Sequence, residues 1–317
     1  MLMCRRQAGS GGLHRRRPNR GRIGESASCG LGFVPDDDPV DRLCIVEPAL
    51  EAGLQPEIKR IIQGYICRVR VVLLHGLTNS RRAFGRLLPL LDDFDVTALD
   101  LPGHGAKARP RTRGAKQSQP CVATIPAMAA AITPEIPGPS LVLGHSLGGI
   151  IATAIAERRP DLVTHLVVVD SPPDVASRVA AKGHERVLRR PVLGPLLWRS
   201  MSRRTIRNGL RTAFAPGFDF PEFFVDDFRL LRWRTFAGAM TSGDEFISEK
   251  PLYDRVAGIA APTTIVFGEM DQRLDPASLA GYASTEATVV TIADAGHTPT
   301  WETPDRVAEA LRATIRR

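Results

Sequence analysis

The sequence has no apolar run long enough to cross a membrane. A membrane-spanning helix needs about 20 consecutive apolar residues, and no stretch of the 317 residues approaches that length. The arginine-rich beginning of the chain is also not followed by the apolar segment that a secretory signal peptide requires. We therefore expect a soluble protein that is not exported.

Cysteine is scarce and shows no pairing pattern. The cysteines are odd in number, scattered and never in a C-x-x-C pair: Cys4, Cys29, Cys44, Cys67 and Cys121. Disulfide frameworks and zinc sites use cysteines at short, repeated spacings. The sequence therefore predicts a cytoplasmic protein with reduced thiols, no disulfide framework and no metal site.

Aromatic residues make up only 6% of the chain, and none lies in its basic beginning. Residues 1–22 hold seven arginines and no acid, and without them the net charge of +8 falls to about +1. Such an arm could contact phosphate or anionic lipid, but it lacks aromatics for base stacking and any zinc-ligand or heptad spacing. We expect no nucleic-acid binding. Residues 1–40 have too little apolar content to offset ordering entropy, which predicts a disordered arm.

From residue 69 onward, short apolar runs rich in β-branched residues alternate with helical patterns. This alternation predicts an α/β fold with a doubly wound, mostly parallel sheet. It stops at 171–254, where apolar residues recur at helical spacing among arginines, so we assign 41–170 and 255–317 to the core and 171–254 to a helical insertion. The predicted strands are 69–74, 96–99, 140–143, 166–169, 263–267 and 288–292, and the predicted helices are 83–91, 125–132, 147–157 and 304–316.

The strongest chemical signal is a G-x-S-x-G motif, Gly144-His145-Ser146-Leu147-Gly148, between an apolar strand and a helix. A serine hydroxyl is a weak nucleophile unless it is exposed and held next to a base. A sharp strand-to-helix turn exposes it, and small residues must flank the serine to permit that turn. The pattern predicts Ser146 as a nucleophile, with free N–H groups of the helix N-terminus facing the reaction centre.

The base and its orienting acid are expected at the ends of later strands. His297 follows the strand 288–292, and Asp271 follows the strand 263–267, which gives the chain order Ser, Asp, His. Asp275 and Asp170 are alternatives for the acid, since both also lie near strand ends. We predict Ser146, Asp271 and His297 as the catalytic residues.

An oxyanion hole needs two backbone N–H groups that face the developing charge. One donor is expected from Leu147, directly after the nucleophile. The other is expected from Leu77, in the loop after the first clear strand, where Gly76 permits the bend. The simpler alternative for His75-Gly76 is an ordinary turn.

Taken together, these pieces resemble the α/β-hydrolase superfamily, in the branch of serine esterases, lipases and haloperoxidase-like enzymes. The resemblance covers roughly residues 68–315. It implies a Ser-His-Asp mechanism on ester-like substrates without metal or cofactor, and a helical cap where 171–254 lies. Such proteins open with a β-hairpin, whereas residues 41–68 show no clear pair of strands. The matching pieces are His75-Gly76-Leu77, Asp100-Leu101-Pro102-Gly103-His104-Gly105, Gly144 to Gly149, Gly268-Glu269-Met270-Asp271 and Gly296-His297.

The cap carries apolar residues at helical spacing, which predicts a hydrophobic acyl group in the substrate. Packing of the cap onto the sheet would explain the same pattern. We assign substrate contacts to residues beside the nucleophile and on the cap: His75, Gly76, His145, Leu197 and Trp198. The cap arginines could rest on an anionic lipid surface, although a charged stripe is usually only a solvated helix face.

The function expected from these residues is hydrolysis of carboxylic esters of a small molecule through an acyl-enzyme. A perhydrolase, a C–C bond hydrolase or an acyltransferase would use the same triad. A ligand receptor that retains the fold is an alternative of another class. The sequence does not indicate the oligomeric state.

Overall fold

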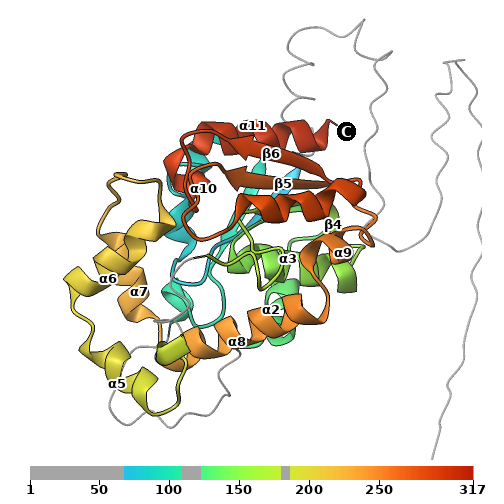
Figure 1. The fold of residues 1–317 in the computed structure, drawn as a ribbon. Helices are drawn as coiled ribbons and strands as arrows, with labels where there is room; N and C mark the ends of the chain where they lie inside the picture. The colour runs from blue at the N-terminus through green and yellow to red at the C-terminus, as the bar shows by residue number, and fades with distance from the viewer. Residues whose placement is uncertain (1–67, 109–122, 180–185, 317) are drawn as a thin grey trace, which may run out of the picture. The chain divides into compact units, whose positions relative to one another are not determined.

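A computed structural model describes residues 68–108, 123–179 and 186–316, all of which lie in one compact unit, 65–317 (Figure 1). The predicted arm 1–40 and residues 41–67, where the opening hairpin was in question, lie outside the described residues.

A parallel sheet forms the centre of the unit. Its six described strands lie in the order β2-β1-β3-β4-β5-β6, and every neighbouring pair is parallel. The predicted α/β fold with a parallel sheet is therefore confirmed. The strands are β1 (Arg70–Leu74), β2 (Asp95–Leu99), β3 (Ser140–His145), β4 (Val163–Val169), β5 (Thr263–Gly268) and β6 (Thr288–Ile292).

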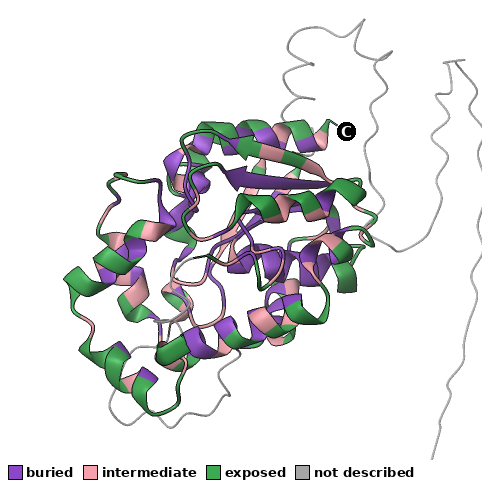
Figure 2. Cartoon of the chain, viewed as in Figure 1, coloured by how far each residue is buried: buried purple, intermediate pink, exposed green. Residues whose placement is uncertain are grey.

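Helices cover both faces of the sheet, which explains why the central strands are apolar on both sides. On one face, α2 (Ile125–Ile132) and α3 (Leu147–Arg158) pack with α9 (Leu252–Val256) against side chains such as Val142 and Leu166. On the other face, α11 (Pro304–Ile315) packs against side chains such as Leu141 and Val167. Every residue of β3 is buried, and Figure 2 shows this central layer in purple.

The stretch between β4 and β5 is helical, as its spacing predicts. The helices α5 (Leu193–Ser200), α6 (Arg203–Leu210) and α7 (Phe223–Leu230) lie beyond the carboxyl ends of the strands (Figure 1). The longer α8 (Trp233–Glu249) returns along the core and contacts both α5 and α2. These helices form a layer over the edge of the sheet where β3 and β5 end.

The predicted helix over 83–91 is wrong in detail. Two short 3-10 helices, η2 (Arg81–Phe84) and η3 (Leu88–Leu90), replace it. Gly85 ends η2, and Pro89 stands in the first turn of η3. Within one continuous helix, the proline ring would clash with the carbonyl of Gly85 and leave it without its N–H donor.

The remaining elements are short connections: η4 (Gly105–Lys107), η5 (Thr133–Glu135), η6 (Arg211–Ala213), η7 (Pro276–Ser284) and α10 (Pro299–Glu302). Among the described helices, none combines the length and the apolar character needed to span a bilayer.

Candidate active site

Ser146 occupies a strained turn between β3 and α3. Its backbone angles, φ 53° and ψ −117°, are rare for a non-glycine residue. The turn is held by two hydrogen bonds: Ser146 N–H donates to the Val169 carbonyl over 2.8 Å, and the Ser171 hydroxyl donates to the Ser146 carbonyl over 2.7 Å. These bonds fix the serine side chain at the carboxyl edge of the sheet.

The flanking glycines are required by backbone contacts. A Cβ at Gly144 would collide with the Gly148 carbonyl, and a Cβ at Gly148 would collide with the carbonyl of Leu74 on β1. The strand can therefore turn directly into the helix only because both positions lack a side chain. This is the strand-turn-helix arrangement that the motif predicts.

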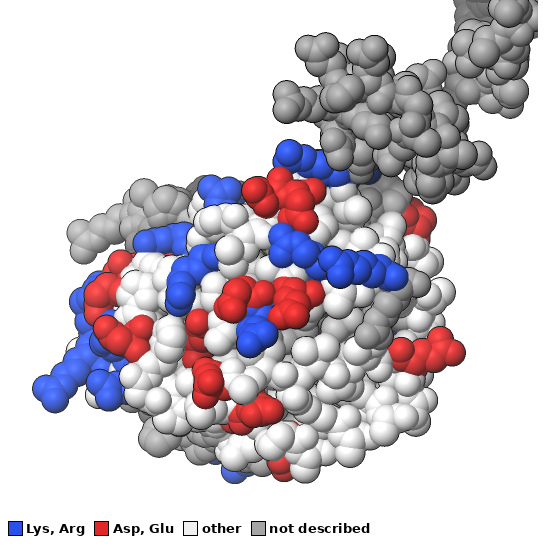
Figure 3. Space-filling model, turned by 90° about the horizontal axis from the view of Figure 1, so that it is seen from above, with Lys and Arg blue, Asp and Glu red and all other residues white. Residues whose placement is uncertain are grey.

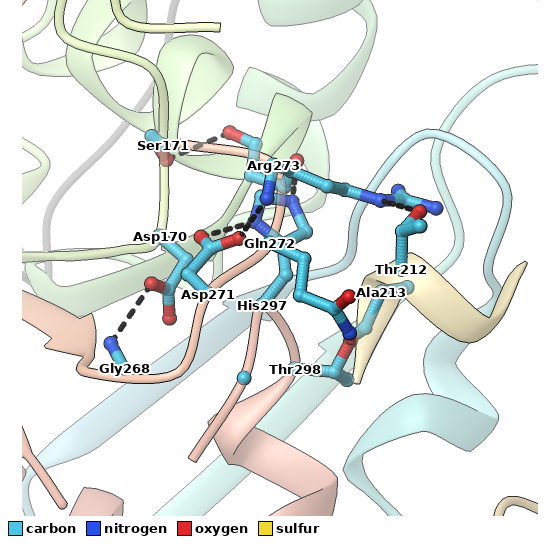
Figure 4. Close-up of polar contacts among 12 residues, drawn as sticks. Asp170, Ser171, Thr212, Ala213, Gly268, Asp271, Gln272, Arg273, His297 and Thr298 are labelled. Carbon is cyan, nitrogen blue, oxygen red and sulfur yellow. Dashed lines mark hydrogen bonds and ion pairs between the residues drawn. The ribbon is translucent and has the colours of Figure 1, made fainter. Parts of the chain in front are cut away.

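The structure brings the three predicted catalytic side chains into one hydrogen-bonded chain. His297 Nε2 lies 3.0 Å from Ser146 Oγ, and His297 Nδ1 lies 2.7 Å from Asp271 Oδ2. Figure 4 shows the Asp271 carboxylate pointing at the His297 ring. With the proton on Nδ1 donated to Asp271, Nε2 is free to accept the serine proton.

The two alternative acids are bonded elsewhere. Asp170 Oδ1 accepts the Gly268 N–H over 3.0 Å, and Asp275 caps η7 by accepting the Ala277 N–H over 2.9 Å. Burial, with a further contribution from the neighbouring Asp271, raises the pKa of Asp170 well above its usual value. Two buried carboxylates this close cannot both ionise readily, so Asp170 is the protonated member of the pair.

Asp271 is the ionised member of the pair. Burial would raise the pKa of Asp271, but the adjacent His297 and the Arg273 N–H, which donates to Oδ1 over 2.7 Å, outweigh it and lower the pKa. An ionised Asp271 can accept the Nδ1 proton of His297, and an acid in this position would also stabilise a protonated imidazole.

The loop after β1 lies against the nucleophile. A Cβ at Gly76 would lie 3.0 Å from the His145 ring and 3.3 Å from Ser146 Cβ, so glycine avoids a crowded contact here. Leu77 follows in the same loop, and Leu147 is the first residue of α3, so its N–H has no partner within the helix. Both leucines line the cavity that contains Ser146. This arrangement agrees with the predicted donors.

His75 supports the loop that follows β1. It is fully buried, its Nδ1 donates to the Gly76 carbonyl over 2.8 Å, and its Nε2 accepts the Leu101 N–H over 3.0 Å. Burial lowers the pKa of His75 well below its usual value, so the neutral ring fastens the loop rather than contacting substrate. His75 is not among the residues that line the cavity, unlike Gly76 and His145, so its predicted substrate contact is not supported.

His145 connects the turn at Ser146 to His297. Its Nε2 donates to the His297 carbonyl over 2.6 Å. Burial, with a smaller contribution from His297, lowers the pKa of His145 to about 3. The ring therefore stays neutral and holds the main chain of His297 beside Ser146.

Two polar groups that sequence reasoning missed also hold this site together. The buried Glu302 accepts N–H bonds from Gly296 and Thr298, on either side of His297, and from Ala215 on the cap, over 3.1, 3.0 and 2.6 Å. His104 Nε2 lies 2.5 Å from the Leu77 carbonyl and fixes that loop. His104 was recognised only as part of a motif, and Glu302 resembles an ordinary acid before a helix.

A cavity of about 250 Å³ opens above Ser146, His297 and the two leucines. Its walls combine the core with the cap, because α6, α7, α8 and the residues on either side of α5 contribute side chains to its lining. Most of these cap side chains are apolar: Leu188, Met201, Ile206, Leu210, Phe228, Phe236 and Met240. Charged side chains also line the cavity: Arg273, and Arg178, whose guanidinium lies 2.6 Å from the Asp244 carboxylate.

The two predicted cap contacts do not reach this cavity. Leu197 points outward with 41% of its surface exposed, and neither it nor Trp198 lines the cavity. Trp198 instead stacks on Phe228 and donates its Nε1–H to the Leu231 carbonyl over 3.1 Å. Helical spacing identified an apolar face of α5, but the aromatic ring is used to hold α5 onto its neighbours.

Comparison with known proteins agrees with this geometry. A sequence model of the alpha/beta hydrolase fold matches residues 69–304. The chain is 36% identical over 129 residues to pimeloyl-(acyl-carrier protein) methyl ester esterase of Neisseria meningitidis serogroup C, which covers 40% of this chain and 45% of that protein. It is 39% identical over 103 residues to lipase LipV of Mycobacterium tuberculosis, which covers 32% of this chain and 36% of that protein. The chain thus spans about half or less of these relatives.

Among solved structures, Cfl2 of Burkholderia cenocepacia has a TM-score of 0.61 at 24% identity, over 78% of this chain and 88% of that one. At this identity the likeness concerns the fold alone. Because the family match extends over most of the described residues, from β1 to the start of α11, the chain belongs to the alpha/beta hydrolase fold family.

Proposed function

We propose that the protein is a serine hydrolase that cleaves carboxylic esters with an apolar acyl group through an acyl-enzyme. The observation that carries the proposal is the hydrogen-bonded chain from Ser146 Oγ through His297 to Asp271, with distances of 3.0 and 2.7 Å. It lies in a cavity with mostly apolar walls. The esterase and lipase named among the relatives support the same reaction class.

The reaction follows from the placement of these atoms. Ser146 Oγ attacks the ester carbonyl carbon while His297 Nε2 takes its proton, and the N–H groups of Leu77 and Leu147 stabilise the oxyanion. His297 then gives the proton to the leaving alcohol. A water molecule, deprotonated by the same nitrogen, cleaves the acyl-enzyme and regenerates Ser146.

The cavity walls favour an apolar substrate group between the core and the cap. Removing apolar surface from water favours binding by about 25 cal/mol per Å², and most of the cap side chains that face Ser146 can contribute such contact. The Arg178–Asp244 pair and Arg273 are charged exceptions in this lining.

The test is hydrolysis of p-nitrophenyl esters from acetate to palmitate by the wild type and by Ser146→Ala. We expect the variant to fall to the background rate, because loss of a nucleophile can cost about a millionfold in kcat. Ser284→Ala, which removes an exposed hydroxyl, is the matched control and should keep full activity.

Covalent labelling separates the possible outcomes. A fluorophosphonate probe should label the wild type and Ser284→Ala but not Ser146→Ala. Full activity of Ser146→Ala would refute the assignment. If the probe labels Ser146 but no ester of any length is hydrolysed, ester hydrolysis is refuted, and C–C bond hydrolysis or acyl transfer becomes the better explanation of the site.

A further inference from the structure

Helix α5 presents apolar side chains to solvent. Val192, Leu193, Leu196 and Leu197, which we call the apolar cap ridge, are 74, 49, 60 and 41% exposed. Leu193, Leu196 and Leu197 share one face of the helix, since residues three and four apart are neighbours. Figure 1 places α5 at the end of the molecule far from β6 and α11, and Figure 2 shows its outward surface in green.

The ridge is not explained by packing of the cap. The inward face of α5 already carries the contacts that hold the helix: Trp198 stacks on Phe228, with ring centroids 4.6 Å apart, and lies 4.7 Å from Phe236. Gly194, also buried, lies against Trp233. Leu193, Leu196 and Leu197 are not part of the hydrophobic cluster around Trp198, although exposing them to water is unfavourable.

The segment that contains the ridge is rich in arginine and has no acid of its own. Residues 186–211 contain eight arginines and no acidic residue. Three of them pair with acids from other segments: Arg189 with Asp244, Arg203 with Glu222 and Asp226, and Arg207 with Asp219 and Glu222. Among the described residues, no ion pair is formed by the other five: Arg186, Arg190, Arg199, Arg204 and Arg211.

We propose that the apolar cap ridge and its unpaired arginines seat the cap on an anionic lipid surface. Aliphatic side chains would enter the boundary between headgroups and acyl chains, while arginines contact lipid phosphates. Figure 3, which views the molecule from above, shows basic side chains next to acidic ones at the left edge, where the pairs of Arg203 and Arg207 account for part of the charge. Among the described helices none can span a bilayer, so the contact is peripheral.

A lipid surface fits these observations better than a protein partner. A second copy of this face would bring arginines against arginines. A protein interface is usually anchored by aromatic side chains at its centre, whereas Trp198 is turned inward and only aliphatic residues remain outside. The proposal does not depend on the proposed hydrolysis, because it concerns binding alone.

The test is co-sedimentation of the full chain with vesicles of phosphatidylcholine containing about 30 mol% phosphatidylglycerol, compared with phosphatidylcholine alone. The wild type should bind the anionic vesicles more tightly, and salt should weaken that binding. Leu193→Gln/Leu196→Gln should reduce the affinity about tenfold. Arg199→Gln/Arg204→Gln should reduce the preference for anionic lipid.

The matched control is Leu88→Gln/Leu90→Gln, which changes two leucines, 37 and 36% exposed, on η3 outside the cap. It should bind vesicles as the wild type does. The basic residues 1–22 are present in every variant, so their contribution cancels. Thermal unfolding of each variant verifies its fold.

Two results would overturn the proposal. One is equal binding by the wild type and Leu193→Gln/Leu196→Gln, which would assign any lipid contact to another part of the chain. The other is absence of vesicle binding together with self-association by light scattering that the same variant abolishes, which would make the ridge an interface between copies.

Discussion

Asp170 and Asp271 follow the neighbouring parallel strands β4 and β5, but of the two only Asp271 is hydrogen-bonded to His297. Its Oδ2 lies 2.7 Å from His297 Nδ1, whereas Asp170 accepts the N–H of Gly268. The two carboxyl groups lie close together in a buried region, where Asp170 is protonated and Asp271 is ionised. Burial and the charge of Asp271 raise the pKa of Asp170. Substitution by a neutral amide should therefore be tolerated at Asp170 but should impair activity at Asp271.

This difference predicts the behaviour of a matched pair of variants. Asp271→Asn should lower kcat by about 10⁴, because the amide stabilises the wrong tautomer of His297 and cannot balance its charge. Asp170→Asn should stay within about fivefold of the wild type, since it replaces an already neutral group. Steady-state hydrolysis of a short p-nitrophenyl ester measures both. Equal losses in the two variants would mean that both acids support His297.

Glu302 fastens the His297 loop to the cap through three N–H donors. In Glu302→Gln, the new amide N–H₂ would face donors of Ala215 and Gly296, which would then lack an acceptor. We expect a loss of about 2 kcal/mol in the free energy of unfolding and a fall in kcat of about tenfold. Urea unfolding and steady-state kinetics measure the two effects.

A control variant distinguishes a role of Glu302 in positioning His297 from a general loss of stability. Glu309→Gln, on α11, changes a side chain that is 72% exposed and pairs with Arg306, so it should alter neither quantity. If the fully folded Glu302→Gln enzyme keeps its kcat and reacts with a fluorophosphonate as fast as the wild type, then Glu302 is structural only.

The sequence predicted the sheet well, and it singled out the three side chains that the structure brings into one hydrogen-bonded chain, because both depend on local signals. Strand β6 was predicted with its observed ends, and the glycines around Ser146 mark a turn that only small residues can form. The failures involve relationships across the chain. Nothing local to Glu302 indicates that it accepts a hydrogen bond from Ala215, 87 positions away.

The cap shows the same limit more sharply. Helical spacing predicted that α5 has an apolar face, but spacing cannot tell which of two apolar faces meets the cavity. Trp198 packs on Phe228 and Leu197 is exposed to solvent. Neither residue therefore has the position in the cavity that its predicted substrate contact requires. Met201, one residue beyond α5, is the side chain of this region that lines the cavity.

His145 predicts a specific loss of stability in acid. Its folded pKa, lowered to about 3 by burial and by His297, lies below the value of 6.5 for an exposed histidine. Below pH 6.5 the unfolded chain therefore binds a proton that the folded chain does not, and the free energy of unfolding falls as the pH falls. The loss should approach about 1.4 kcal/mol per pH unit between pH 6 and pH 4.

His145→Gln removes this titration while its amide can still donate to the His297 carbonyl. The wild type should therefore lose stability relative to the variant as the pH is lowered, and the two should run parallel above pH 7. Urea unfolding at several pH values measures the difference. His75 and His104 remain in both proteins, so their contributions cancel. If the free energy of unfolding changes equally with pH in the wild type and in His145→Gln, then His145 takes up its proton in the folded state as it does in the unfolded state.

The last prediction concerns the part of the substrate that occupies the cavity. Met201 lines the cavity and is only half-buried, so Met201→Trp should fill space with little strain in the core. If the acyl chain lies between core and cap, kcat/KM for long-chain esters should fall about tenfold while that for acetate stays nearly constant. Leu197→Trp, which enlarges an exposed side chain outside the cavity, should change neither value. An equal loss for acetate and long esters would instead mean that Met201 supports Ser146 and its neighbours, with the acyl chain lying elsewhere.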